Sequence, residues 1–197
     1  MLVTIVASFA TFERPATKFN LLFSPYLAQR GEWYRVLTHA FIHADVMHLV
    51  FNMFVLYNFG YYVEDLFMLY HGDAKGEYFY AVLYVGGILF ATLPGFAKHS
   101  ENDSYFSLGA SGAVAAVVFA FILMEPSRDL YLLFLPIPIP AFIFGIAYLA
   151  LEFYLDKRGQ GRVAHDAHFW GAIFGFVFTG MLDTSRFSEF FTNFIPT

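Results

Sequence analysis

Charged side chains are rare in this chain and fall in clusters between long apolar stretches. Of its 197 residues, 58% are hydrophobic and only 14% are charged, against roughly 25% charged in an ordinary soluble domain. Several stretches approach the roughly 20 apolar residues that a helix needs to cross a bilayer. The pattern therefore predicts one all-α domain, residues 1–197, that is a polytopic integral membrane protein with multiple passes through the lipid bilayer.

Six apolar segments are expected to cross the membrane as helices. The first is short, but Thr11, Glu13 and Pro15 at its end do not resemble a signal-peptide cleavage site, so we expect a helix. Polar connectors rich in Gly, Pro, Asp and Ser separate the segments. The expected spans are residues 1–13, 38–63, 79–97, 108–124, 136–154 and 167–182. The tail, residues 183–197, carries phenylalanines at helical spacing and is expected to lie along the membrane interface.

Charge and cysteine content exclude several function classes. The net charge is −5 and the chain has no cysteine. An acidic chain lacks the basic stripe of a nucleic-acid-binding protein, so we expect no nucleic-acid partner. Without cysteine there is no thiolate nucleophile and no cysteine-ligated zinc.

One cluster of polar residues lies inside an apolar stretch, "HAFIHADVMHLVFN" at 39–52. Polar side chains in hydrocarbon are costly without partners, so such a cluster is a functional-site hypothesis. Asp45 is a suitable N-cap, because its carboxylate can accept from free backbone N–H groups. A helix that begins there places His48 and Asn52 four residues apart on one face. His39 and His43 precede this helix and are expected to be structural.

Two further motifs can place a nucleophile beside a base. Ser111 opens the fourth span and His168 opens the sixth, and both spans carry small residues at helical spacing. Such residues allow membrane helices to approach closely. The face formed by Gly171 and Gly175 can meet either Ser111 and Ala115 or Gly112 and Ala116 on the fourth span. The two spans run parallel in an alternating bundle, so Ser111 and His168 lie level, and the histidine can act as general base.

Together these motifs resemble those of the rhomboid intramembrane serine proteases. "GASG" at 109–112 is similar to the GxSG nucleophile motif, and "AHFWGAIFG" at 167–175 is similar to the AHxxGxxxG base motif. "HADVMHLVFN" resembles the HxxxxHxxxN segment of the second helix, and "WYR" at 33–35 resembles a Trp-Arg element of the first loop. The resemblance covers nearly the whole chain and implies a six-transmembrane-helix bundle of rhomboid type.

The resemblance also implies a function: a serine endopeptidase that cleaves transmembrane segments of other membrane proteins with a Ser–His dyad. It implies Ser111 as nucleophile and His168 as general base, with no metal and no cofactor. His48, Asn52 and the Ser111 backbone N–H would stabilise the oxyanion. The remaining motif positions have structural roles: Tyr34, Arg35, Glu64 (at the end of the second helix), Gly109, Gly112, Gly171 and Gly175. No oligomeric state is implied.

Two features concern the surroundings of the dyad. Ala115 stands where some family members have a tyrosine that stacks on the catalytic histidine, so nothing in the motifs names the group that orients His168. Asp166 lies two positions before His168, on a different helix face. We therefore expect no third catalytic residue beside Ser111 and His168. The proline-rich fifth span and the connector at 156–164 are candidates for a gate and a lid.

Two other functions are alternatives. "HAFIH" could be the histidine box of a membrane metalloenzyme, because imidazoles four residues apart can bind transition metals. This chain has seven histidines, no adjacent pair and no HExxH motif, which weakens that reading. The other alternative is a catalytically inactive rhomboid-like protein that binds membrane clients.

The resemblance places the protein in a bacterial inner membrane, with both termini in the cytoplasm and the active site open to the extracytoplasmic side. This orientation puts only Lys75, Arg128 and Arg186 inside and the other eight Lys and Arg residues outside. That distribution is the reverse of the positive-inside bias.

Overall fold

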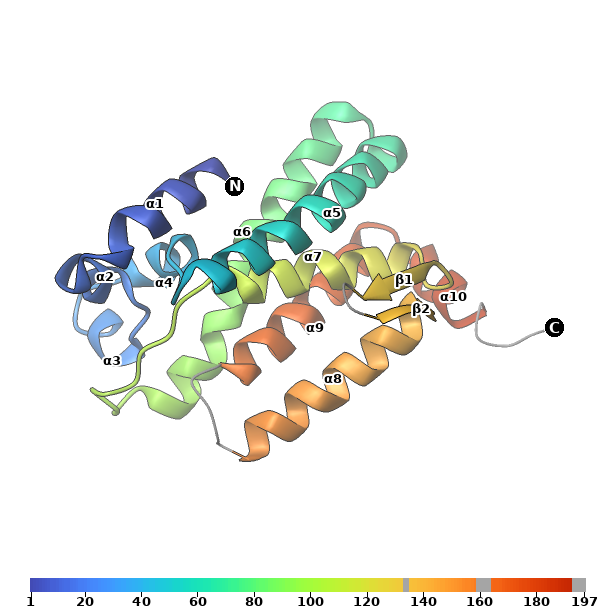
Figure 1. The fold of residues 1–197 in the computed structure, drawn as a ribbon. Coiled ribbons are helices and arrows are strands. Elements are labelled where there is room, and N and C mark those ends of the chain that lie inside the picture. Colours follow the sequence, from blue (N-terminus) through green and yellow to red (C-terminus); the bar gives the residue numbers. More distant parts are fainter. Residues whose placement is uncertain (133–134, 159–163, 193–197) are drawn as a thin grey trace.

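The chain is mostly helical, with one small hairpin of two strands (Figure 1). The computed structural model describes residues 1–132, 135–158 and 164–192. In chain order the elements are α1 (Leu2–Phe12), α2 (Pro15–Leu21), α3 (Pro25–Ala28), α4 (Arg35–Thr38), a 3-10 turn (His39–Phe41), α5 (Val46–His71), α6 (Asp73–His99), α7 (Ser111–Met124), β1 (Asp129–Leu132), β2 (Leu135–Pro140), α8 (Ala141–Arg158), α9 (His165–Leu182) and α10 (Ser185–Thr192).

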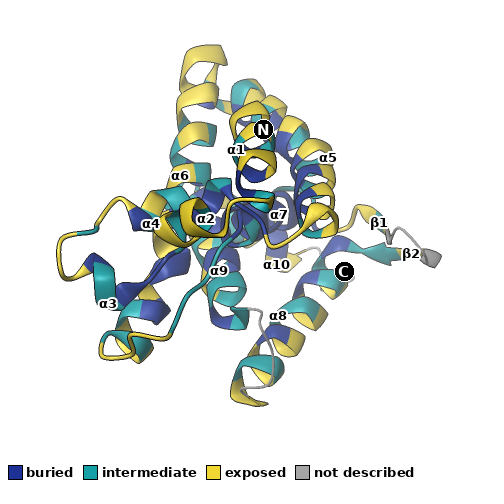
Figure 2. Cartoon of the chain, turned by 60° about the vertical axis from the view of Figure 1, so that its left-hand side comes forward, coloured by how far each residue is buried: buried dark blue, intermediate teal, exposed yellow. Residues whose placement is uncertain are grey.

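Helix α7 is the centre of the molecule. It packs against α5, α6, α8, α9 and α10, and Gly112 to Leu123 are all buried. Figure 2 shows this burial as a dark helix surrounded by helices whose outer faces are exposed. Its residues are almost entirely apolar or small, as expected for a helix with neighbours on every side.

The second and third spans differ from the prediction at their ends. The second was expected over residues 38–63, but α5 begins at Val46, where the Asp45 carboxylate accepts from the backbone N–H of His48 at 2.8 Å. This cap is the predicted one, and it separates residues 38–45 from the long helix. At the other end α5 continues to His71, so Glu64 lies within the helix rather than at its end. Gly72 alone separates α5 from α6, so the third span, expected over residues 79–97, is longer at both ends and runs from Asp73 to His99.

The fifth span begins with a strand, which corrects the all-α prediction. Residues 135–140 form β2, antiparallel to β1, with Asp129 opposite Pro140 and Leu130 opposite Ile139. Pro136, Pro138 and Pro140 explain the difference. Each proline lacks a backbone N–H and disfavours helical conformation in the residue before it. Helix α8 therefore starts at Ala141, after the last proline, and continues to Arg158. Residues 159–163 of the connector expected as a lid lie outside the described residues.

Helices α7 and α9 touch through their backbones. A Cβ atom placed on Gly171 would overlap the Gly112 carbonyl, and one placed on Gly175 would overlap the Ala116 carbonyl. Of the two faces that the sequence offered, α7 therefore uses Gly112 and Ala116. Both helices run in the same direction, so their first turns lie at the same end of the molecule (Figure 1).

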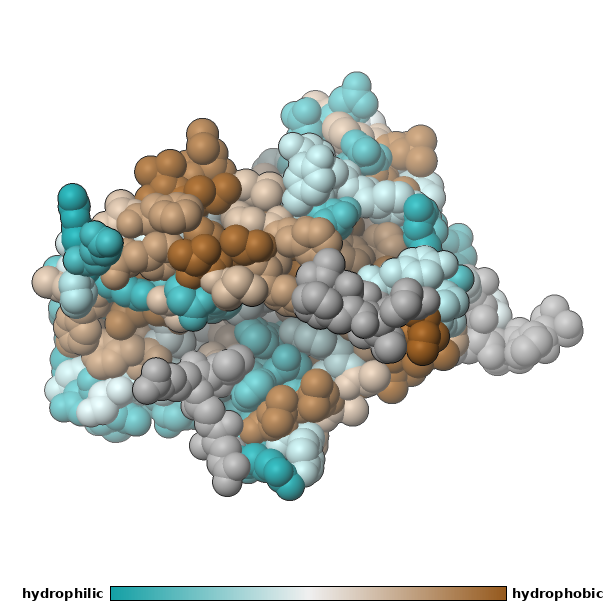
Figure 3. All heavy atoms as spheres, viewed as in Figure 1, coloured by the Kyte–Doolittle hydropathy of each residue, from teal (hydrophilic) through white to brown (hydrophobic). Residues whose placement is uncertain are grey.

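Helices α5 and α6 are each long and apolar enough to cross a membrane, judged by length and composition. Helices α1 and α7 are also apolar but shorter. In the space-filling view, apolar side chains gather over α1 and the first turns of α5, and polar ones gather at the far tip where α5 meets α6 (Figure 3). The segments predicted as helical spans 1, 4 and 6 coincide with α1, α7 and α9 to within three residues.

Replacing Gly175 by alanine should force α7 and α9 apart. Overpacking of this kind typically costs about 1–3 kcal/mol, so we expect a lower melting temperature in detergent. Gly86→Ala in α6 is the matched control, because the atoms nearest to its new methyl belong to the side chain of Phe174 and not to a backbone. Equal melting temperatures for the two variants would contradict the backbone contact.

Candidate active site

Ser111 and His168 meet at one end of the helix pair. Ser111 is the first residue of α7, and His168 lies in the first turn of α9. The Ser111 Oγ and the His168 Nε2 are 2.7 Å apart, which is a hydrogen-bonding distance. The contact of Gly171 with the Gly112 backbone lies beside this pair, and it holds the first turns of α7 and α9 together. This arrangement can transfer the serine proton to the imidazole.

Both side chains line a cavity of about 540 Å³. Its walls come from α5, α6, α7, α9 and the segments that precede them, and include Phe23, His39, His48, Thr92, Tyr105 and Gly109. Tyr105, in the loop ahead of α7, stays neutral because burial raises the pKa of its phenol to about 12. The cavity is thus large enough for a short extended peptide segment and carries few charges.

His48 and Asn52 occupy different places relative to this cavity. His48 lines it, and its ring lies against Gly109, two residues before Ser111. Its Nδ1 accepts from the backbone N–H of Ala44 at 3.5 Å. Asn52 is buried one turn further along α5, where its Nδ2 donates to the His48 carbonyl at 2.9 Å. The structure therefore brings His48 to the dyad, while the Asn52 amide is bonded within its own helix.

The other two histidines of this cluster are buried. His43 Nδ1 lies 3.0 Å from the Ser8 hydroxyl of α1, and its Nε2 accepts from the Ala110 backbone N–H at 3.5 Å. These bonds tie α1 to the residue ahead of the serine, as expected for a structural histidine. The Nε2 of His39 has no hydrogen-bond partner among the described residues.

Arg35 organises the first loop. Its side chain is 2% exposed and donates to the Glu32 carboxylate and to the backbone carbonyls of Phe19 and Leu22, at 2.6, 2.7 and 2.9 Å. Tyr34 also donates to Glu32. These hydrogen bonds hold the pKa of Glu32 below its usual value. The predicted loop motif is therefore a structural anchor, and it supports the wall of the cavity at Leu22 and Phe23.

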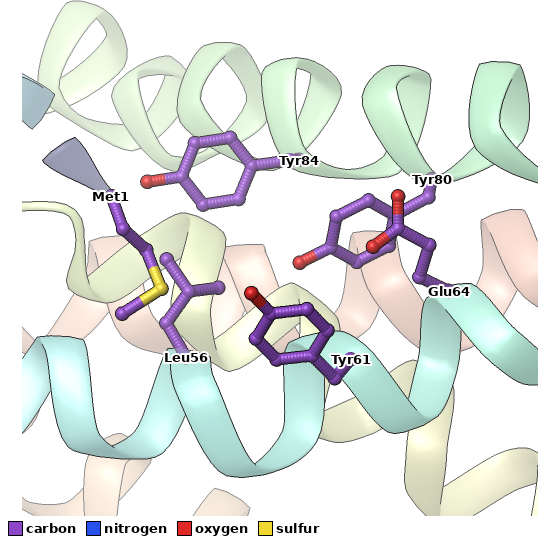
Figure 4. Close-up of a pocket in the computed structure, with 6 residues that line it drawn as sticks. All are labelled: Met1, Leu56, Tyr61, Glu64, Tyr80 and Tyr84. Atoms are coloured by element: carbon purple, nitrogen blue, oxygen red, sulfur yellow. The ribbon is translucent and has the colours of Figure 1, made fainter. Parts of the chain in front are cut away.

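Glu64 is not near the dyad. It lies between α5 and α6 beside a separate cavity of about 280 Å³, with Tyr61, Tyr80 and Tyr84 around it (Figure 4). The phenol groups of Tyr61 and Tyr80 point toward the middle of this cavity (Figure 4). Glu64 thus remains a residue of the helix interface.

Sequence reasoning missed Glu152. Its Oε1 lies 3.1 Å from His168 Nδ1 and its Oε2 lies 2.7 Å from His165 Nδ1. We expected no third residue beside the dyad because Asp166 lies on another helix face. That expectation considered only the local motif, whereas α8 supplies a carboxylate from outside it. A signal was present: Glu152 is the single charged residue within the predicted fifth span, and a charge in an apolar span is a functional hypothesis by default.

The alternative reading, a histidine box at His39 and His43, finds no third metal ligand beside these two residues in the described part of the chain. Within the described part of the chain, the group of three side chains that could hold a metal ion is Glu152, His165 and His168, without His39 or His43. Their separations of 2.7 and 3.1 Å are those of direct hydrogen bonds. His43 Nδ1 is bonded instead to the Ser8 hydroxyl.

Comparison with known proteins identifies relatives. A family model described as the rhomboid domain matches residues 30–184. The chain is 30% identical over 179 residues to the RHOMBOID-like protein 12, mitochondrial, of Arabidopsis thaliana, covering 85% of this chain and 52% of that protein. It is 30% identical over 144 residues to the Presenilin-associated rhomboid-like protein A, mitochondrial, of Danio rerio, covering 72% and 35%. A Bos taurus protein of similar name is 29% identical over 146 residues, covering 71% and 36%.

The chain spans about half or less of the length of these relatives. All three bear mitochondrial names, which point to a mitochondrial membrane and make the prediction of a bacterial inner membrane wrong. The physical reason is that the length of the apolar segments indicates insertion into a bilayer but does not identify the membrane. The Lys and Arg distribution already ran against the predicted orientation.

Arg35→Lys should destabilise the first loop. Lysine keeps the charge but cannot reproduce the guanidinium fork that reaches one carboxylate and two carbonyls. Hydrogen bonds to charged groups contribute about 1.5–3 kcal/mol each, so we expect a clear fall in melting temperature. Arg30→Lys is the control, because Arg30 is exposed and donates to one carbonyl only. A fall in melting temperature for Arg35→Lys that is no larger than the fall for Arg30→Lys would refute the anchor role of Arg35.

Proposed function

The chain belongs to the rhomboid family of membrane proteins, and we propose that it is an intramembrane serine endopeptidase. The observation that carries this proposal is the 2.7 Å contact between Ser111 Oγ and His168 Nε2 inside a cavity. A nucleophile with a base in hydrogen-bond reach is the signature of covalent catalysis. We propose transmembrane segments of other proteins as substrates and a mitochondrial membrane as the location.

The proposed reaction proceeds through an acyl-enzyme. His168 Nε2 takes the Ser111 proton as Oγ attacks the scissile carbonyl carbon, and the carbonyl oxygen becomes an oxyanion. His168 then protonates the amine as the C–N bond breaks. Water attacks the resulting ester by the same route and restores Ser111. This sequence uses no metal or cofactor.

Three groups are proposed to stabilise the oxyanion. The backbone N–H of Ser111 lies at the N-terminus of α7, where N–H groups lack helical partners and the helix dipole is positive. Because His48 Nδ1 accepts from Ala44, its proton resides on Nε2, which can donate toward the cavity. Asn52 can contribute once its amide leaves the His48 carbonyl. We therefore rank His48 above Asn52.

We propose that the chain forms one domain of six spans in the bilayer. Helix α7 has 14 residues, which corresponds to about 21 Å at 1.5 Å per residue. This is shorter than the roughly 30 Å of bilayer hydrocarbon, and α7 is shielded by its neighbours. Ser111 would therefore lie below the membrane surface, and the cavity, with His48 and His168 in its wall, would bring water to it. The α8 segment is the proposed gate for substrate.

Both retained catalytic residues argue against an inactive relative. A client-binding protein has no need of a serine hydroxyl and an imidazole at hydrogen-bond distance. The hydrogen-bonded pair therefore favours catalysis over binding alone.

Ser111→Ala and His168→Ala should each abolish cleavage of a generic transmembrane substrate by the purified protein. Removal of either member of such a pair costs most of the rate, about 10⁶-fold in a well-studied serine protease. Wild type should also react with a fluorophosphonate at Ser111, and both variants should keep the melting temperature. A variant that cleaves at more than a few per cent of wild type would remove that residue from the dyad.

The effect of metal chelators on activity distinguishes the proposed serine protease from the metalloenzyme alternative. Activity should survive EDTA and 1,10-phenanthroline. Loss of activity that returns with added metal would favour the metalloenzyme.

His48→Ala should reduce kcat more than Asn52→Ala does. Loss of one oxyanion donor typically costs about 10²–10³ in kcat, and His48 already faces the cavity. His43→Ala is the comparison, since it should lower the melting temperature with a smaller effect on kcat. Loss of turnover in a His43→Ala protein that melts normally would place "HAFIH" in the chemistry.

A further inference from the structure

Glu152 lies between two histidines of α9. Its two carboxylate oxygens contact different rings, Oε1 with His168 Nδ1 at 3.1 Å and Oε2 with His165 Nδ1 at 2.7 Å. The residue is 7% exposed. Its ion-pair partners among the described residues are these two histidines, whereas the neighbouring Lys98 pairs with Asp156 and Asp166. Tyr148 of the same helix also bonds to this carboxylate. Among the described residues no Lys or Arg pairs with Glu152, so its charge acts on the two histidine rings.

We infer that Glu152 is the positioning residue for His168 and completes a Ser111–His168–Glu152 triad with a member from each of α7, α9 and α8. An ionised carboxylate can only accept hydrogen bonds. The His168 Nδ1 beside it must therefore carry the ring proton, and the lone pair of the neutral imidazole lies on Nε2. That nitrogen is the one that faces Ser111 at 2.7 Å.

The same contact assists the reaction after proton transfer. When Nε2 takes the serine proton, the ring becomes an imidazolium whose Nδ1–H still points at Glu152. The carboxylate stabilises this cation and keeps its own negative charge, while the proton on Nδ1 stays in place. The group therefore performs the orienting task for which the family motif offered no residue in this chain, since position 115 is alanine.

Glu152 is the anionic group in contact with the His168 ring. From α5, His48 faces the ring across the cavity, and from α7 the neutral Ser111 does. His165, one turn earlier on α9, has its ring centroid 6.2 Å away. Lys98 of α6 is bonded to Asp166 and Asp156. The charged residues of α10 lie near the opposite end of α9.

The kinetic part of this inference rests on the proposed protease function. Glu152→Gln removes the charge at nearly constant shape, and we expect kcat to fall about 10²- to 10⁴-fold with little change in KM, as for orienting acids of other triads. The acidic limb of the kcat/KM profile should move to lower pH by about one unit or more, because the imidazolium loses its stabilising charge. Glu152→Asp should recover part of the activity.

Asp156→Asn is the matched control. Asp156 lies one turn further along α8 and pairs with Lys98, so its loss tests whether α8 is merely displaced. We expect an unchanged acidic limb and at most a modest change in kcat for this variant, because Asp156 bonds to Lys98 and not to the His168 ring. A Glu152→Gln protein with wild-type kcat and an unchanged limb would overturn the inference, as would equal losses in both variants.

Nuclear magnetic resonance tests the positioning without any cleavage. In protein labelled with ¹⁵N-histidine, the nitrogen shifts report which ring atom carries the proton, and a His168→Asn sample assigns the signal. Wild type should show His168 protonated on Nδ1, and Glu152→Gln should show a mixture of tautomers. An unchanged tautomer would refute the role of Glu152. Absence of both cleavage and fluorophosphonate labelling in wild type would instead refute the protease function, while the tautomer still decides the role of Glu152.

Discussion

The backbone contact between α7 and α9 is the constraint on which the site depends. Gly171 and Gly175 have no side chain where α9 crosses the carbonyls of Gly112 and Ala116. Apolar helices in lipid gain nothing from burying one another's apolar surface, so their association depends on such close packing. Because the helices run parallel, the contact also brings Ser111 and His168 to the same level, within 2.7 Å.

The buried polar groups of this apolar chain form hydrogen bonds with one another. Arg35 satisfies two loop carbonyls and a carboxylate, and the His43 ring joins Ser8 of α1 to the residue ahead of Ser111. Glu152 joins α8 to both histidines of α9. A polar group without a partner is costly in a medium of low dielectric constant, so each network fixes the position of a segment. Together they position the segments around the cavity.

Under the proposed function, α8 has two tasks. It lies at the edge of the molecule, beside α9 and the β1–β2 hairpin (Figure 1), where a gate for a helical substrate is expected. It also carries Glu152, which contacts the catalytic base. Movement of α8 would therefore change both the access of substrate and the orientation of His168, which couples entry to chemistry.

Much of the fold and the site followed from the sequence. Apolar length identified the helices and the Asp45 cap set the start of α5. Motif spacing named Ser111, His168 and His48 as candidates, and the structure places all three around one cavity. These features are local along the chain. The sequence did not predict the β2 strand, the full length of α5 or the hydrogen bond from Asn52 to the His48 carbonyl. Glu152 is 16 residues before His168 along the chain and on another helix. Only tertiary packing brings that carboxylate to the ring, since no local periodicity relates residues on separate helices.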